Sequence, residues 1–251
     1  MTTPGPAGFD EALRVVADVR GWMTDDQARR LWDRAAVVAA GGQIVEIGSY
    51  QGRSAIVLAR AAAPQVEVVA IDPHAGNDRG PQEIHGTLNE GERDHQAFRA
   101  NLDQAGVGDR VRHVRRPSQE ATEDVAGPVD LLYIDGAHRY RPARDDIRLW
   151  AARVAEGGTI LIHDSFCSIG VTGAIATQLL GRRDVRFVGR VGSLAEYRRE
   201  EPHAGGRWRS VGRQVAQLPW FVRSVIIKVL LVARLRPLTR LLGHRSGEWP
   251  Y

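Results

Sequence analysis

The stretch "QIVEIGSYQGRSAIVLAR", residues 43–60, decides the fold of this chain. It starts with a short apolar run, turns at Gly48 and Gly52, and continues with apolar residues at helical spacing. Glycine permits a tight turn and a close backbone approach to a ligand, so the stretch predicts a strand, a ligand-binding turn and a helix. It lacks the G-x-G-x-x-G of dinucleotide sites and the Gly-Lys-Ser/Thr of phosphate loops. A plain structural turn between strand and helix would give the same glycine pair.

Strands and helices alternate along the rest of the chain. Further apolar runs that predict strands lie at 66–72, 110–116, 129–135 and 158–164. Helical patterns lie at 8–40, with Thr24 as an N-cap, and at 94–106, 118–126 and 142–158. Because the strands are apolar on both faces, we predict an α/β fold with a doubly wound, mostly parallel sheet. N-terminal helices precede this sheet, and a basic helical tail follows it.

The chain divides into a main domain and an extension. We expect one domain over 1–201, which includes N-terminal helices within 1–40, and a basic amphipathic extension over 202–251. The polar segment 74–94 is longer than a connection between a strand and a helix needs. We therefore interpret it as a substrate loop.

Composition narrows the class of protein. The chain has 251 residues, of which 43% are hydrophobic and 25% are charged, as in ordinary globular proteins. Cys167 is the one cysteine, so an intramolecular disulfide is excluded and a cysteine-based zinc site is not expected. The first residues lack an apolar segment behind a basic start, which predicts a cytoplasmic protein.

The extension is strongly basic. No Asp or Glu occurs from 202 to 247, whereas nine Arg and Lys residues do. Arg223, Lys228 and Arg234 interrupt its apolar run, which we interpret as too short and too charged to span a bilayer. Segment 207–245 suits a helix on an anionic membrane surface, and packing on the core or on a second subunit explains it equally well. No recognition motif accompanies the charge, so we expect no nucleic-acid partner.

Two carboxylates indicate the ligand of the glycine turn. Asp72 ends the second strand, where a carboxylate can accept hydrogen bonds from a ribose diol, although Asp-Pro also forms simple turns. Glu46 would repel a pyrophosphate and suits a cationic ligand. These residues together favour an adenosine ligand that lacks phosphates and carries positive charge. S-adenosylmethionine is such a ligand.

With these residues, the chain resembles the class I S-adenosylmethionine-dependent methyltransferases, and in particular the metal-dependent catechol O-methyltransferase type. The motifs that carry the resemblance are "IVEIGSYQGRSAIVLAR", "AGVGDRVRHVRRPSQE", "VDLLYIDGAHRY" and "GGTILIHDSF". It covers 40–200, and the sugar- and antibiotic-tailoring O-methyltransferases are the most similar subgroup. The resemblance implies a set of donor-binding residues: Glu46, Gly48, Ser49, Gly52, Ser54, Asp72, Ser118, Gln119 and Asp135.

The resemblance also implies a Mg²⁺ site where the fourth and fifth strands end. Its ligands would be Asp135 and Asp164, because Mg²⁺ prefers hard oxygen ligands. The family often has Asn after the second aspartate, and this chain has Ser165, a weaker ligand that we assign as the third. Turn-forming acids at strand ends are the alternative explanation.

His138, three residues after Asp135, occupies the position of the family's catalytic base. Histidine can accept a proton near neutral pH. A surface histidine at the start of the next helix is the competing explanation. His163 lies within the fifth strand, where it would orient Asp164.

The function expected from the resemblance is a Mg²⁺-assisted O-methyltransferase that acts on a sugar, an oligosaccharide or a glycosylated natural product. A phenol or catechol acceptor stays open, as do two other classes: an NAD-dependent oxidoreductase and a non-catalytic domain that binds S-adenosylmethionine. We also expect a homodimer.

Overall fold

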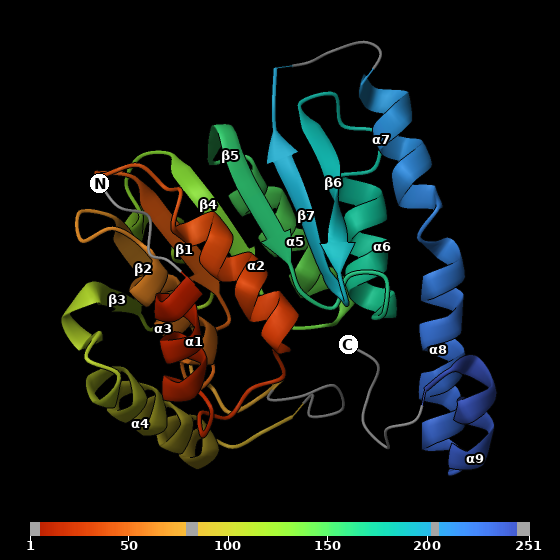
Figure 1. The fold of residues 1–251 in the computed structure, drawn as a ribbon, viewed down its shortest axis with the longest axis horizontal. Helices are drawn as coiled ribbons and strands as arrows, with labels where there is room; N and C mark the ends of the chain where they lie inside the picture. The colour runs from red at the N-terminus through yellow and green to blue at the C-terminus, as the bar shows by residue number, and fades with distance from the viewer. Residues whose placement is uncertain (1–5, 79–84, 202–205, 245–251) are drawn as a thin grey trace.

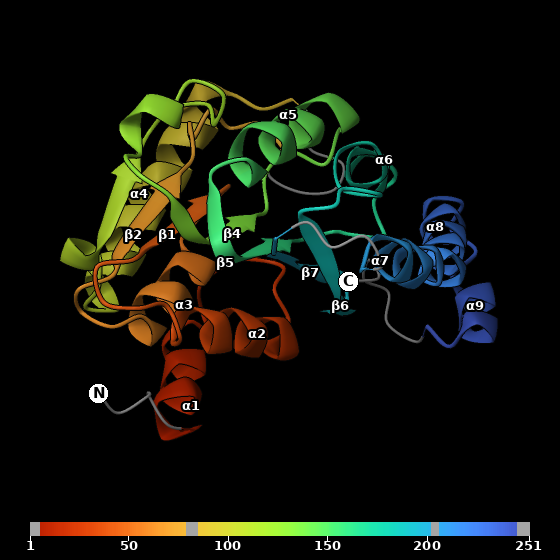
Figure 2. The same ribbon diagram turned by 90° about the horizontal axis from the view of Figure 1, so that it is seen from above.

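The computed structural model describes residues 6–78, 85–201 and 206–244. Over these residues the fold is a seven-stranded sheet between two layers of helices (Figures 1 and 2). The strands are β1 Gln43–Ile47, β2 Glu67–Ile71, β3 Val111–Val114, β4 Val129–Ile134, β5 Val154–Ile162, β6 Val185–Val191 and β7 Leu194–Arg199. The main-domain helices are α1 Pro6–Val15, α2 Asp25–Ala35, α3 Arg53–Ala61, α4 Leu88–Gln104, α5 Tyr140–Ala151 and α6 Ile169–Gln178.

The strand order is β3-β2-β1-β4-β5-β7-β6. The first five strands are parallel, and β7 runs antiparallel to both β5 and β6. The chain leaves β1 towards β2 and β3, then returns to place β4 on the other side of β1. Ligands bind at the carboxyl ends of strands at such a reversal. The predicted doubly wound, mostly parallel sheet is confirmed.

The sheet is buried on both faces. All five residues of β1 are buried; Ile44 packs into the core under α1, α2 and α3, and Val45 packs into the core under α5 and α6. Figure 2 shows these helices on opposite sides of the sheet. Burial on both faces explains why the strand sequences are continuously apolar. α2 begins after the predicted N-cap Thr24, whose hydroxyl accepts a hydrogen bond from the Gln27 amide.

Three segments differ from the sequence-based prediction. The helix expected at 142–158 ends at Ala151, because residues from Val154 onward pair with β4 as part of β5. Segment 118–126 forms turns and a short 3-10 helix, Thr122–Asp124, since its backbone is tied to α5 through Ser118. Within the expected loop 74–94, α4 already begins at Leu88, after a capping box at Thr87. Residues 79–84 lie outside the described residues.

The hairpin formed by β6 and β7 was not predicted. Its strands carry several charged side chains, because one of them, β6, forms the edge of the sheet. Glu196 of β7 is buried and forms ion pairs with Arg30 and Arg34 of α2. The hairpin therefore joins the sheet to the N-terminal helices.

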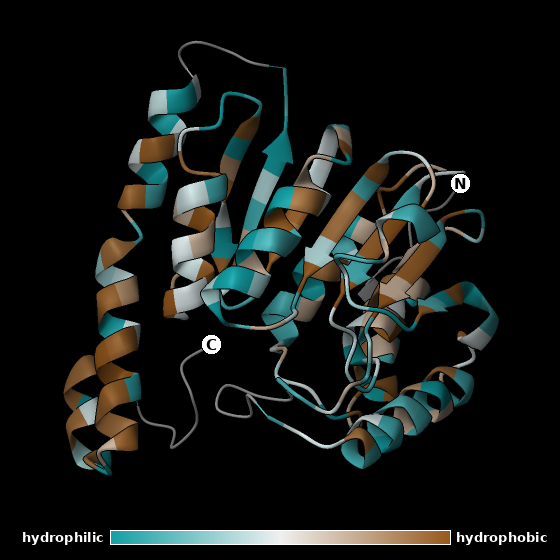
Figure 3. Ribbon diagram, turned by 180° about the vertical axis from the view of Figure 1, so that it is seen from behind, coloured by the Kyte–Doolittle hydropathy of each residue, from teal (hydrophilic) through white to brown (hydrophobic). Residues whose placement is uncertain are grey.

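The C-terminal extension is helical over its described residues. It contains α7 Gly206–Val215, α8 Leu218–Val232, α9 Arg236–Thr239 and the 3-10 turn Arg240–Leu242. α7 contacts β6, and α8 packs on the core through Ile227, Trp220 and Phe221 (Figure 1). Figure 3 shows apolar residues gathered over α8 and α9. The division into 1–201 and 202–251 stays a prediction.

One helical segment of the described chain, 206–232, is long and apolar enough to cross a membrane by length and composition. This finding corrects the sequence-based statement that the apolar run is too short and too charged. It is weak evidence of a span, because a single such helix also occurs in proteins that do not cross membranes.

Candidate active site

A cavity of about 580 Å³ lies at the carboxyl ends of β1, β2 and β4. Backbone hydrogen bonds hold these ends together: the Gly48 amide donates to the Ile71 carbonyl, and the Asp135 amide donates to the Ile47 carbonyl. Its lining includes predicted donor-binding residues: Gly48, Ser49, Ser54, Asp72, Ser118 and Gln119. Asp135 and His138 also line it.

The turn after β1 requires its glycines. Gly48 has a φ of +84°, and a Cβ atom there would lie 2.3 Å from the Asp135 carbonyl oxygen. Gly52 has a φ of +91°, and its Cβ atom would lie 3.2 Å from the Phe98 ring. Only glycine fits at position 48 without a shift of the backbone. The turn can therefore pass directly over the end of β4.

Asp72 holds this turn in place. Its Oδ2 atom accepts hydrogen bonds of 2.9 Å from the amides of Ser49 and Tyr50. Its Oδ1 atom accepts one of 2.8 Å from the His74 amide. The carboxylate thus connects the ends of β1 and β2, a role that the sequence-based ribose assignment did not include.

Glu46 lies beneath the turn. It is fully buried, accepts a hydrogen bond from the Ser54 hydroxyl, and is not among the described residues that line the cavity. Burial raises the pKa of Glu46 to about 8, although the hydroxyls of Ser54 and Ser49 oppose the rise. Glu46 therefore contacts the lining of the cavity through Ser54 and does not line it directly.

The sequence analysis missed Asp146. This buried residue of α5 lines the cavity, and its Oδ1 atom accepts hydrogen bonds from the Ser118 hydroxyl and, at 3.0 Å, from Gln119 Nε2. Burial raises its pKa to about 6, despite the hydrogen bond from Ser118. Trp150, four residues later on the same helix, donates a hydrogen bond to the Ser118 carbonyl. No local sequence pattern marks Asp146 for this position.

An aromatic pair from the N-terminal region also lines the cavity. The rings of Trp22 and Tyr50 are 5.4 Å apart, and Trp22 comes from the connection between α1 and α2. Of the loop histidines, His74 lines the cavity and packs against His95 and Phe98. The sequence carried no local signal for the contact between Trp22 and Tyr50, whereas the place of His74 in the segment 74–94 makes it a candidate for the substrate pocket.

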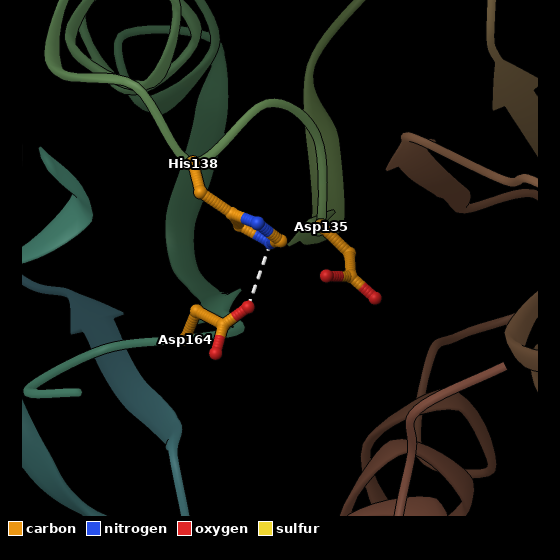
Figure 4. A group of neighbouring side chains, drawn as sticks. All are labelled: Asp135, His138 and Asp164. Carbon is orange, nitrogen blue, oxygen red and sulfur yellow. Dashed lines mark ion pairs between the residues drawn. The ribbon is translucent and has the colours of Figure 1, made fainter. Parts of the chain in front are cut away.

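Asp135, His138 and Asp164 converge beside this cavity (Figure 4). One ligand atom from each lies within 4.8 Å of the other two, which is close enough to hold a metal ion. His138 Nε2 lies 2.6 Å from Asp164 Oδ2, and the Tyr133 hydroxyl donates a 2.8 Å hydrogen bond to Asp135 Oδ2. Two carboxylates and an imidazole fit a divalent cation.

Charges within this group oppose the effect of burial. Burial alone would lower the pKa of His138, but the charge and hydrogen bond of Asp164 outweigh it and raise that pKa. Burial would raise the pKa of Asp164, but His138 and His163 hold it well below its ordinary range. His163 is buried, with Nδ1 3.2 Å from Asp135 Oδ1, so it contacts one carboxylate and lies near the other.

The structure places Ser165 differently from the other assigned ligands. Its hydroxyl donates a 2.8 Å hydrogen bond to the Ile162 carbonyl, and its amide donates to the Ser193 carbonyl. His138, rather than Ser165, completes the group with the two aspartates.

Comparisons with known proteins indicate the family of the domain and the fold. Residues 45–165 match a family model described as a methyltransferase domain. The catechol O-methyltransferase of Mycobacterium tuberculosis is 33% identical over 124 residues, which are 49% of this chain and 47% of that protein. This chain thus covers about half the length of that curated relative.

Solved structures share the fold over a larger part of the chain. The cofactor-bound protein Rv0187 from MTB is 26% identical, with a TM-score of 0.53, over 78% of this chain and 91% of its own. The O-methyltransferase TomG from Streptomyces achromogenes, in complex with SAM, is 18% identical, with a TM-score of 0.55, over 80% and 92%. The second likeness concerns the fold alone. These likenesses support a class I S-adenosylmethionine-dependent methyltransferase, with the methyltransferase domain matched at residues 45–165.

Proposed function

We propose that this protein transfers a methyl group from S-adenosylmethionine to a hydroxyl of a sugar, an oligosaccharide or a glycosylated natural product. The observation that carries the proposal is the convergence of Asp135, His138 and Asp164 beside the cavity at the ends of β1, β2 and β4. A methyl donor in that cavity would present its sulfonium to an acceptor oxygen held at this group.

The donor would be held by the residues of the first cavity. The turn at Gly48 permits close backbone contact, and Asp72 fixes that turn through the Ser49 and Tyr50 amides. Ser118 and Gln119, held by Asp146, would contact the adenine. Positioning is the main contribution expected of these residues, because the sulfonium is already activated.

The methyl transfer would form one carbon–oxygen bond and break one carbon–sulfur bond. The acceptor oxygen attacks the methyl carbon, the carbon–sulfur bond breaks, and S-adenosylhomocysteine leaves as a neutral thioether. His138 would take the hydroxyl proton at Nδ1, because its Nε2–H donates to Asp164 Oδ2, 2.6 Å away, and this carboxylate stabilises the resulting imidazolium. His163, in contact with Asp135, keeps the carboxylates in position.

Asp135 and Asp164 would hold a Mg²⁺ ion in this proposal. When bound, such an ion would lower the pKa of a hydroxyl that coordinates it.

A phenol or catechol acceptor is the second candidate. The similarity of 124 residues to a mycobacterial catechol O-methyltransferase favours it. An NAD-dependent oxidoreductase is disfavoured by the match to a methyltransferase domain. A purely binding role is disfavoured by the close charge pair of the half-buried His138 and the buried Asp164, which a binding domain would not need.

Calorimetry tests the donor, and an activity screen tests the acceptor. The protein should bind S-adenosylmethionine and not NAD; binding of NAD alone would overturn the proposal. A screen with isotope-labelled donor across sugars, glycolipids, catechols and simple phenols should then give transfer to a hydroxyl.

The proposal includes two expectations about assembly. We expect a cytoplasmic homodimer, which light scattering after gel filtration would test. We also propose that segment 207–245 contacts anionic membrane surfaces, because Leu235, Leu238 and Leu241 are exposed in a stretch without acidic residues. Co-sedimentation with anionic but not with neutral vesicles would support this contact.

A further inference from the structure

A second cavity, of about 550 Å³, lies between α8 and the segments that follow β4 and β5. Asp78, His138 and Arg139 line both this cavity and the donor cavity. The ion pair of Arg139 and Asp78, at 2.7 Å, lies where the two meet. Asp164 lines the second cavity as well. The reacting group of the proposed function therefore stands between two spaces, each large enough for a small molecule.

α8 gives the second cavity an apolar wall. Val225, Val229, Val232 and Ala233 line it at the spacing of one helical face, and Lys228 of the same helix lines it beside them. Val229 is 60% exposed and Val232 is 64% exposed, so water covers these side chains when the cavity is empty. Ile169 of α6 lines the same cavity and is also exposed. An occupant with an apolar surface would remove these side chains from water.

We propose that this second cavity is the acceptor pocket, and that α8 selects an acceptor with an apolar portion. The reacting hydroxyl would lie at His138, and an alkyl chain or an apolar aglycone would lie along Val225, Val229 and Val232. This inference rests on the proposed function and narrows its acceptor to an amphiphilic hydroxyl compound, such as a glycoside with an apolar aglycone. A free sugar would leave the valines of α8 in contact with water.

The test compares two glucosides that differ in their apolar part. Calorimetry would measure the binding of octyl β-glucoside, below its micellar concentration, and of methyl β-glucoside to the full chain saturated with S-adenosylhomocysteine. The bound thioether keeps both probes out of the donor cavity. Octyl glucoside should bind at least tenfold more tightly, because burial of each methylene is favourable.

Variants of α8 locate the binding. Val229→Asp should lower the affinity for octyl β-glucoside at least tenfold. Val229→Leu keeps the side chain apolar and should retain that affinity. Ile226→Asp is the matched control, because Ile226 is 42% exposed on the same helix and is not among the described lining residues. Thermal melts would verify that all three variants fold.

Three outcomes would overturn the inference: equal affinity for the two glucosides, no binding of octyl glucoside, or an equal loss in Ile226→Asp, which would indicate adsorption to the outer surface. Failure of the protein to bind S-adenosylmethionine would instead overturn the proposed function. The two failures are therefore distinguishable.

Discussion

His138 joins the two cavities and carries the only proton transfer in the proposed reaction. Replacing it with Ala should lower kcat by about 10²- to 10⁴-fold, the range typical of a lost general base. The affinity for S-adenosylmethionine, measured by calorimetry, should change little. His85→Ala is the control, because His85 is exposed and lies outside the described lining of both cavities. Turnover that survives His138→Ala would refute the base assignment.

Glu46 should make the stability of the protein depend on pH. Burial raises its pKa from the ordinary 4.5 to about 8, so between these values the folded state keeps a proton that the unfolded state releases. The free energy of unfolding should therefore fall as pH rises through this window, by up to about 1.4 kcal/mol per pH unit. Glu46→Gln should flatten this dependence in urea titrations at several pH values. Glu120→Gln, which alters an exposed carboxylate, should leave it in place; an unchanged slope in Glu46→Gln would contradict the expectation.

At the scale of elements, the turn between β1 and α3 depends on the close approach at Gly48. Gly48→Ala places a Cβ atom 2.3 Å from the Asp135 carbonyl oxygen. The substitution should therefore lower the free energy of unfolding by about 3 kcal/mol or more and weaken donor binding. Gly106→Ala is the matched control, with a φ of +68° and nothing within 4 Å of the added atom. Gly106→Ala should lower the free energy of unfolding by only about 1 kcal/mol, because it loses only the freedom of glycine to adopt a positive φ. Equal losses in urea unfolding would show that backbone strain, and not the contact with β4, explains the glycine.

The parallel strands were predictable and the hairpin was not, for a physical reason. β1, β2, β4 and the inner part of β5 are buried on both faces, so their sequences are mostly apolar, and Asp72 and Asp135 directly follow β2 and β4. β6 lies at the edge of the sheet, where charged side chains reach water and weaken the pattern. β5 also begins with Val154, Ala155 and Glu156, which continue the helical pattern of α5 and therefore predict an extension of the preceding helix.

The residues of the candidate site also fall into those that the sequence predicts and those that it does not. Asp72, Asp135 and Asp164 follow strand ends, and parallel strands bring their carboxyl ends to one edge, so their proximity follows from topology. Asp146 and Trp22 approach the cavity from a helix and from a connection between helices. Their positions depend on packing between segments far apart in the sequence, which no local pattern records.

For the whole molecule, the metal is the component to test first. Activity should be lost in EDTA and restored by Mg²⁺, because Asp135 and Asp164 supply the hard oxygen atoms that this ion prefers. Mg²⁺ alone should raise the Tm of the parent protein and not that of Asp164→Asn. Calorimetry in EDTA should still show binding of S-adenosylmethionine. Full activity in EDTA would remove the metal from the mechanism.

The meeting of the two cavities at Asp78, His138 and Arg139 also bears on the order in which substrates bind and products leave. Donor and acceptor would approach His138 through different cavities, one at the ends of β1, β2 and β4 and the other against α8. Neither would have to pass through the space that the other occupies. Either substrate could then enter first, and the spent donor could be exchanged while the methylated product still lies against α8. Such an enzyme would show random-order kinetics, with S-adenosylhomocysteine competing against the donor and not against the acceptor.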